Sequence, residues 1–110
     1  MNMAQTPTMP PRSIEAEQGL LGAVLMSGGT VLDRIEGVIK PADFYREEHG
    51  RIFAAAKALH DAGRPVDVVT VFDALTSAGS AERVGGFAYL GEIANGTPSA
   101  ANARRYAEII

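Results

Sequence analysis

The chain has 110 residues, a length that suits one domain with one modest core. Its 46% hydrophobic and 21% charged residues predict a folded chain, and the absence of cysteine excludes disulfides and thiolate catalysis. The formal net charge of −3 opposes direct binding to nucleic acid, because affinity for phosphate backbones needs clustered Lys and Arg.

Residues 1–12 contain three Pro and three Met and are predicted to form a disordered tail. They lack the continuous apolar run of a secretory signal. Charged residues or Gly interrupt every apolar segment of the chain before it reaches the roughly 18 residues that cross a bilayer. We therefore expect no membrane insertion and a cytoplasmic location.

The first helix is predicted to begin with Ser13 as N-cap and to end near Ser27, before Gly28 and Gly29. Acidic residues near its start suit the positive end of the helix dipole. Its apolar residues recur at helical spacing and predict one buried face, formed by Ala16, Leu20, Leu21, Ala23, Val24 and Leu25.

A shorter second helix follows, with Thr30 as the expected cap and Pro41 as the stop. In the connector after it, Asp43 is expected to cap the next turn, and Phe44 and Tyr45 are expected to fill the gap between helices. The predicted apolar face of this second helix consists of Val31, Ile35, Val38 and Ile39.

The third helix is predicted over residues 47–62, with Gly63 as a left-handed C-terminal residue. Gly50 is unusual inside it, since a mid-helix Gly costs about 1 kcal/mol relative to Ala. Either the helix starts later or Gly50 permits a close packing contact. The predicted buried face consists of His49, Ile52, Phe53, Ala56 and Leu59.

Residues 66–72 alternate as a strand would, with many β-branched residues. We favour a helix, because Asp67 is a natural N-cap and Gly79 ends the segment at a suitable distance. A single strand would also lack a partner. The helical reading places Val68, Val71, Phe72 and Leu75 on one face.

Two more helices complete the predicted fold. The fifth opens after Gly85 and Gly86 and stops at Gly96, and the sixth starts with Pro98 in its first position. The sixth helix has no stop signal, which predicts that the chain is a fragment of a longer protein. The inward residues are expected to be Phe87, Leu90, Ile93 and Ala94 in the fifth helix and Ala103, Tyr106, Ala107 and Ile110 in the sixth.

The predicted fold class is therefore all-α, a compact bundle of about six short helices without a sheet. No catalytic, cofactor or metal site is expected, because the chain lacks a phosphate loop and its His and acidic neighbours point in different directions on a helix. His49 is interpreted as a hydrogen-bonded packing residue and His60 as a solvated charge near a helix C-terminus. Arg104 and Arg105 are interpreted as a solvated face.

Tyr89 differs from the other tyrosines because it lies off the apolar face of its helix. An exposed aromatic side chain can anchor a protein partner, although a boundary position explains Tyr89 equally well. We select Glu15 and Tyr89 as the candidate partner surface.

Several motifs, taken in order, resemble the start of a DnaB-type replicative DNA helicase. Each motif is weak alone, but together they span residues 10–110 with matching order and spacing. Gly19 and Gly50 are small departures that concern local helix stability. The motifs are residues 13–18 (SIEAEQ) with Leu21-Gly22, 43–45 (DFY) with His49, Ile52 and Phe53, 63–70 with Gly63, Pro65, Val66, Asp67 and Thr70, 85–90 with Gly85-Gly86 and Tyr89-Leu90, and 97–102 (TPSAAN) with Tyr106-Ala107.

The resemblance implies that residues 13–110 form a helical N-terminal collar domain, followed in the whole protein by a linker hairpin and a RecA-like ATPase domain that this chain lacks. ATP and Mg²⁺ would bind in that missing domain. The implied partners are further copies of itself, as a dimer or within a hexamer, together with primase and the helicase loader.

The alternatives to a helicase N-terminal domain belong to three classes of protein. A helicase-binding C-terminal domain of a primase, or a free-standing helical adaptor, would share the acidic helical character. A small DNA-binding regulator would need a basic recognition helix, and none of the predicted helices is basic enough. A small acid/base enzyme would need converging carboxylates or imidazoles, which the helical spacing does not supply.

Overall fold

The computed structural model describes residues 11–96 and 100–110. In this part of the chain it contains six α-helices, two short 3-10 helices and no strand, which confirms the predicted all-α class. Residues 1–10 of the predicted disordered tail lie outside the described residues. The elements are α1 (Pro11–Met26), α2 (Thr30–Arg34), η2 (Pro41–Asp43), α3 (Glu47–Asp61), α4 (Val68–Ser77), α5 (Gly86–Gly96), η3 (Ala100–Asn102) and α6 (Ala103–Ile109).

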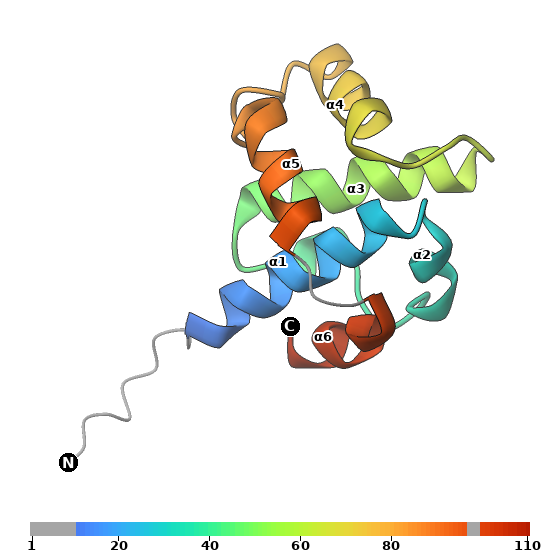
Figure 1. Cartoon of the computed structure of the whole chain (residues 1–110), viewed down its shortest axis with the longest axis vertical. Coiled ribbons are helices and arrows are strands. Elements are labelled where there is room, and N and C mark those ends of the chain that lie inside the picture. Colours follow the sequence, from blue (N-terminus) through green and yellow to red (C-terminus); the bar gives the residue numbers. More distant parts are fainter. Residues whose placement is uncertain (1–10, 97–99) are drawn as a thin grey trace.

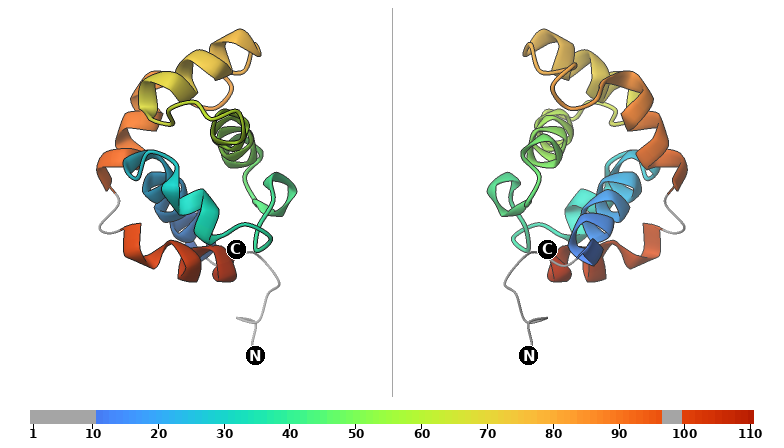
Figure 2. Two further views of the ribbon diagram at one scale, coloured as in Figure 1. Left: turned by 90° about the vertical axis from the view of Figure 1, so that its right-hand side faces the viewer. Right: turned by 90° about the vertical axis from the view of Figure 1, so that its left-hand side faces the viewer.

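Helix α1 is the centre of the domain. It packs against α3, α5 and α6, whereas α4 packs against α3 and α5 (Figure 1). The side views place α4 and α6 at opposite ends, with α1 and α3 between them (Figure 2). A helix that is surrounded in this way must be apolar around most of its circumference.

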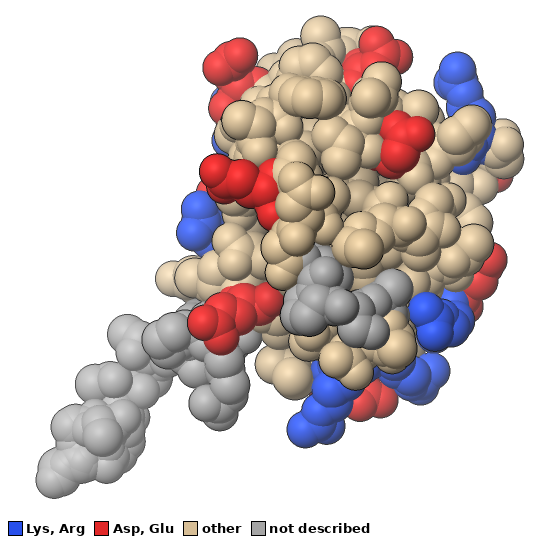
Figure 3. All heavy atoms as spheres, in the orientation of Figure 1, with Lys and Arg blue, Asp and Glu red and all other residues tan. Residues whose placement is uncertain are grey.

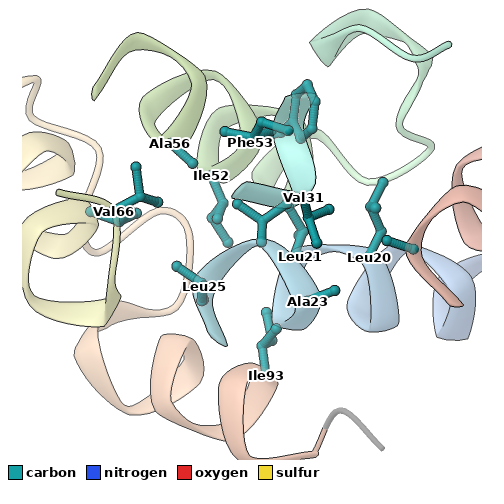
Figure 4. Packing of buried hydrophobic residues seen from close by; sticks show 14 of the residues in the cluster. Leu20, Leu21, Ala23, Leu25, Val31, Ile52, Phe53, Ala56, Val66 and Ile93 are labelled. Atoms are coloured by element: carbon teal, nitrogen blue, oxygen red, sulfur yellow. The ribbon is translucent and has the colours of Figure 1, made fainter. Parts of the chain in front are cut away.

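The core forms where α1 meets α2 and α3. Figure 4 shows Leu21 and Val31 facing Ile52 and Phe53, while Ile93 of α5 approaches from the other side of α1. These side chains are at most 5% exposed. Burial of such side chains contributes roughly 1.5–3 kcal/mol each before entropy is counted.

The beginnings of the first two helices differ from the predictions. Helix α1 begins at Pro11, so Ser13 lies inside it and is not the N-cap. Pro suits a first helical turn, because the N–H that it lacks would be unsatisfied there. Thr30 is the first residue of α2 rather than its cap, and Ser27 Oγ instead accepts from the Val31 N–H at 3.2 Å.

Helix α2 ends at Arg34, earlier than predicted, although Ile35 and Ile39 are buried as expected. The connector after it also corrects two predictions. Asp43 closes η2, where its carboxylate accepts from the Lys40 N–H at 2.9 Å, and it does not cap α3. Phe44 is buried, but Tyr45 is 60% exposed and does not fill the gap.

Gly50 is explained by close packing between α3 and η2. A Cβ on Gly50 would lie 2.7 Å from the backbone oxygen of Pro41, closer than real Cβ atoms approach. The helix begins at Glu47, as predicted, so the late-start alternative is wrong. Gly50 therefore lowers the intrinsic stability of α3, but it allows the backbones of α3 and η2 to approach closely.

Helix α4 confirms the choice of helix over strand. The Asp67 carboxylate accepts from the Thr70 N–H at 2.8 Å, and the Thr70 hydroxyl accepts from the Asp67 N–H at 2.9 Å. This reciprocal cap satisfies donors that the first turn leaves free. Gly63 and Gly79 adopt positive φ angles of 73° and 75° after α3 and α4, as predicted.

The last two helices follow the predictions in part. Helix α5 spans Gly86–Gly96, and Leu90 and Ile93 are buried, but Phe87 is 50% exposed and does not face inward. The predicted start of the sixth helix at Pro98 lies outside the described residues. Further along, Ala103 and Ala107 of α6 are buried, with Tyr106 and Ile110 partly buried beside them.

Candidate interaction groove

A groove of about 570 Å³ runs between α1, α5 and α6. Small and apolar residues form much of its lining. One of them, Gly19, lets the Tyr106 ring approach the backbone of α1 closely. A Cβ on Gly19 would lie 2.9 Å from that ring. The described residues of the lining are Glu15, Ala16, Gln18, Gly19, Tyr89, Glu92, Ile93, Gly96, Tyr106 and Ile109.

The charged residues that the structure describes in the groove are acidic. Glu15 and Glu92 are exposed, and among the described lining residues there is no Lys, Arg or His. Basic side chains gather instead over α6 at the lower end of the view in Figure 3. The groove therefore carries negative charge beside an apolar floor.

The carboxylate of Glu17 is buried behind this groove. The side chain is 1% exposed and accepts hydrogen bonds from the backbone N–H groups of Tyr45 (2.6 Å) and Arg46 (3.4 Å). A buried carboxylate is costly unless such donors satisfy it. Glu17 thereby ties α1 to the connector that precedes α3.

His49 continues the network from Glu17 to the groove wall. It is 0% exposed, and its Nδ1 lies 2.7 Å from Glu17 Oε1. Its Nε2 lies 2.7 Å from the hydroxyl of Tyr89, which also accepts from Gln18 Nε2 at 3.2 Å. The prediction that His49 is a hydrogen-bonded packing residue is confirmed.

The structure brings the two selected partner residues, Glu15 and Tyr89, into the same groove. Tyr89 is more than an exposed anchor, because its hydroxyl group belongs to the buried network.

The environment of His60 differs from the prediction. The side chain is 25% exposed and lies 2.9 Å from Asp33 of α2, so it is paired rather than solvated.

Sequence reasoning missed Glu17 as a functional or structural centre and read it only as a charge near a helix terminus. A signal was available, because Glu17 shares a helix face with Leu20, Leu21 and Val24 at spacings of three, four and seven. A carboxylate inside an apolar face indicates a buried, partnered group.

The groove offers a concave surface between three helices. Within residues 11–96 and 100–110, no three His, Asp or Glu side chains come together as metal ligands. In the same residues, no helix has both the length and the apolarity that crossing a bilayer requires. The geometry defines an all-α domain with an open, acidic groove backed by a buried polar network.

Comparisons with known proteins identify the family. The family described as the DnaB-like helicase N terminal domain matches residues 9–110. The chain is 44% identical over 102 residues to the replicative DNA helicase DnaB of Geobacillus stearothermophilus, and 45% identical over 102 residues to the replicative DNA helicase DnaC of Bacillus subtilis (strain 168). Both alignments cover 93% of this chain and 22% of the relative.

A solved structure agrees. The crystal structure of the N-terminal domain of DnaB helicase from Mycobacterium tuberculosis matches with a TM-score of 0.83 and 40% identity, over 92% of this chain and 72% of that one. The chain belongs to the DnaB-like helicase N-terminal domain family. It spans about a fifth of the length of the curated relatives, at 22%.

Proposed function

We propose that this chain is the N-terminal, non-catalytic module of a hexameric replicative DNA helicase, and that it acts by binding other copies of itself, primase and the helicase loader in the cytoplasm. Its family membership supports this proposal, as does its match to a small part of each relative. ATP, Mg²⁺ and DNA would bind in the remaining part of such a protein.

The observation that carries the partner-binding proposal is the groove between α1, α5 and α6. It places Glu15 and Tyr89 on one concave surface, where a partner side chain can contact both. Concave surfaces with an apolar floor and a few directed polar groups are typical of binding sites. The groove is therefore the surface that we assign to primase.

Calorimetric titration with the primase encoded in the same genome tests this assignment. Glu15→Ala should weaken binding without lowering the melting temperature, because Glu15 is exposed. The matched control is Glu82→Ala, an exposed acidic residue that does not line the groove. Equal affinity of the Glu15 and Glu82 variants would remove the groove from the proposal.

Self-association has a separate candidate surface on the outer face of α4 and α5. Val69 is 64% and Phe87 is 50% exposed, and the Phe87 ring packs edge-on against Phe72 at a centroid distance of 5.3 Å. Contiguous exposed apolar patches mark protein interaction sites, and we propose that Val69 and Phe87 belong to such a patch. Sedimentation at rising concentration should show dimers that Phe87→Ser weakens, and a strict monomer at high concentration would oppose self-association of this domain.

The primase-domain alternative is not favoured, since the relatives described above are named as helicases. The downstream coding sequence separates the remaining readings. A helical hairpin followed by a phosphate loop within roughly a hundred residues supports the helicase proposal. A stop codon directly after Ile110 would support a free-standing adaptor instead.

A further inference from the structure

Five polar residues of the groove decide which hydrogen-bonding groups a partner meets there: Glu15, Gln18, Tyr89, Glu92 and Tyr106. Carboxylates can only accept hydrogen bonds at neutral pH. The amide nitrogen of Gln18 donates one N–H to Tyr89. The Gln18 oxygen remains an acceptor, and the second N–H remains a donor. The character of the wall therefore depends on the direction of the Tyr89 hydroxyl group.

That direction can be deduced from the buried end of the network. The backbone N–H groups of Tyr45 and Arg46 can only donate, so both oxygens of Glu17 act as acceptors. In the neutral His49 ring with its proton on Nδ1, that N–H donates to Glu17 Oε1 over 2.7 Å, and Nε2 is an acceptor.

The other end of the network agrees with this assignment. Tyr89 has one hydroxyl hydrogen and already accepts from Gln18, so it satisfies His49 Nε2 by donating to it over 2.7 Å. The two rings are parallel within 1°, with centroids 6.0 Å apart. Each hydrogen on the path from the Gln18–Tyr89 hydrogen bond to Glu17 then has one acceptor.

We propose that Glu17 and His49 are positioning residues that turn the Tyr89 hydroxyl hydrogen inward, and that the groove consequently binds a Lys- or Arg-bearing segment of a partner protein. The remaining lone pair of Tyr89 then joins the oxygens of Glu15, Gln18 and Glu92 as an acceptor. The identity of the partner rests on the proposed function, whereas the hydrogen-bond order does not.

Charge and shape support a basic occupant. Glu15 and Glu92 provide two exposed negative charges, and the described residues of the lining include no cation. Ile109, which is 39% exposed, offers apolar surface to the aliphatic stem of a Lys or Arg side chain. The hydroxyl group of Tyr106 can donate or accept a hydrogen bond, so it is compatible with a basic as well as an acidic occupant.

The first test is NMR of the His49 ring nitrogens. Long-range ¹H–¹⁵N spectra of the wild-type chain should show a neutral ring with the proton on Nδ1. In Glu17→Gln the new amide group should donate to Nδ1, so the proton should move to Nε2 and the Tyr89 hydroxyl should lose its acceptor. A wild-type ring protonated on Nε2, or a variant without the reversal, would overturn the proposed order.

The second test measures which chemistry the groove accepts. N-acetyl-arginine amide should shift the backbone amide signals of Gln18, Gly19 and Glu92 in a saturable manner, and N-acetyl-glutamate amide should not. Glu92→Lys should weaken the arginine response about fivefold, within the range of exposed charge pairs, and Glu82→Lys should leave it unchanged. Equal responses to both amides, or equal effects of both variants, would overturn the basic occupant.

A further variant covers the possibility that Glu17→Gln does not fold. Tyr89→Phe keeps the ring and removes the oxygen, so the arginine response should fall about tenfold, the contribution of one hydrogen bond to a charged group. An undiminished response would exclude Tyr89 as an acceptor. If primase binding fails while these results hold, the proposed partner is wrong and the groove chemistry stands.

Discussion

Two hollows in the described part of the domain are built in different ways. The groove between α1, α5 and α6 holds about 570 Å³ and is backed by the hydrogen-bonded network from Glu17 to Tyr89. The hollow between α3 and α4 holds about 460 Å³ and is lined mainly by small apolar side chains with Arg51 and Arg64. Directional bonds fix the first surface, whereas the second depends on non-directional apolar packing.

The difference teaches where this domain is sensitive to substitution. A hydrogen-bonded network fails when any member is removed, because its partners remain buried without satisfaction. Apolar packing at an exposed edge loses only the contacts of the altered atoms. Substitutions behind the acidic groove should therefore have larger effects than substitutions in the hollow of α3 and α4.

The largest expected effect belongs to Glu17→Ala. It leaves His49 and the N–H groups of Tyr45 and Arg46 buried without their acceptor, and we expect a loss of about 3–5 kcal/mol in the free energy of unfolding. Urea denaturation measures this loss. Ala58→Leu, which adds an apolar side chain to the exposed lining of the second hollow, should change the stability by less than about 0.5 kcal/mol. A larger effect of Ala58→Leu would reverse the comparison.

A second contrast uses two helical glycines. Gly19→Ala places a Cβ against the Tyr106 ring and should cost about 1–3 kcal/mol. Gly91→Ala in α5 meets no atom within 4 Å and should stabilise the domain by about 0.5–1 kcal/mol. Thermal unfolding compares the two variants. Equal effects would show that the ring moves away without cost.

The N-cap of α4, a helix that lines the second hollow, is expected to give a smaller effect on stability when it is removed. Asp67→Ala removes the acceptor of the Thr70 N–H and should cost about 1 kcal/mol. Asp73→Ala, an exposed position inside the same helix, is the matched control and should stay within about 0.5 kcal/mol of wild type. Circular dichroism melts can separate these values.

The smallest expected effect depends on pH. The side-chain hydrogen bond from Arg46, at 2.6 Å, lowers the pKa of Glu48 below its ordinary value of about 4.3. A lowered pKa in the folded state means that the pair stabilises the domain above pH 4.3, and that this stabilisation is lost as the pH falls through the folded pKa.

Glu48→Gln should therefore cost roughly 0.5–1 kcal/mol at pH 7, the upper range of partly exposed ion pairs, and nothing near pH 2. Melting temperatures at both pH values, with Glu82→Gln as a control, measure the difference. A cost that persists at pH 2 would assign the effect to packing rather than to charge.

Sequence reasoning succeeded where the signal was local. Asp67, Gly63 and Gly79 define helix ends through contacts within four residues, so their roles follow from the sequence. The choice of Glu15 and Tyr89 as a surface came from a family resemblance and an off-face position. Their placement in one groove depends on how α1 and α5 pack, which the sequence does not specify.

The errors have physical causes. Glu17 and His49 are separated by 32 residues, and His49 and Tyr89 by 40, so local periodicity cannot show that they meet. Phe87 has the correct spacing for the buried face of α5, but it lies near the helix start, where the neighbouring Phe72 packs at the surface. Tyr45 is exposed because its N–H, rather than its ring, turns toward the core.

The contact of Gly50 with Pro41 has a consequence for the buried carboxylate. Residues 41–46 form a short chain segment between that contact and the two N–H groups that bind Glu17. A bulkier residue at position 50 would push η2 outward and draw those donors away from their acceptor. The lack of a side chain at one position on α3 thus sets a distance on α1, and tolerance to substitution at residue 50 should depend on which residue occupies position 17.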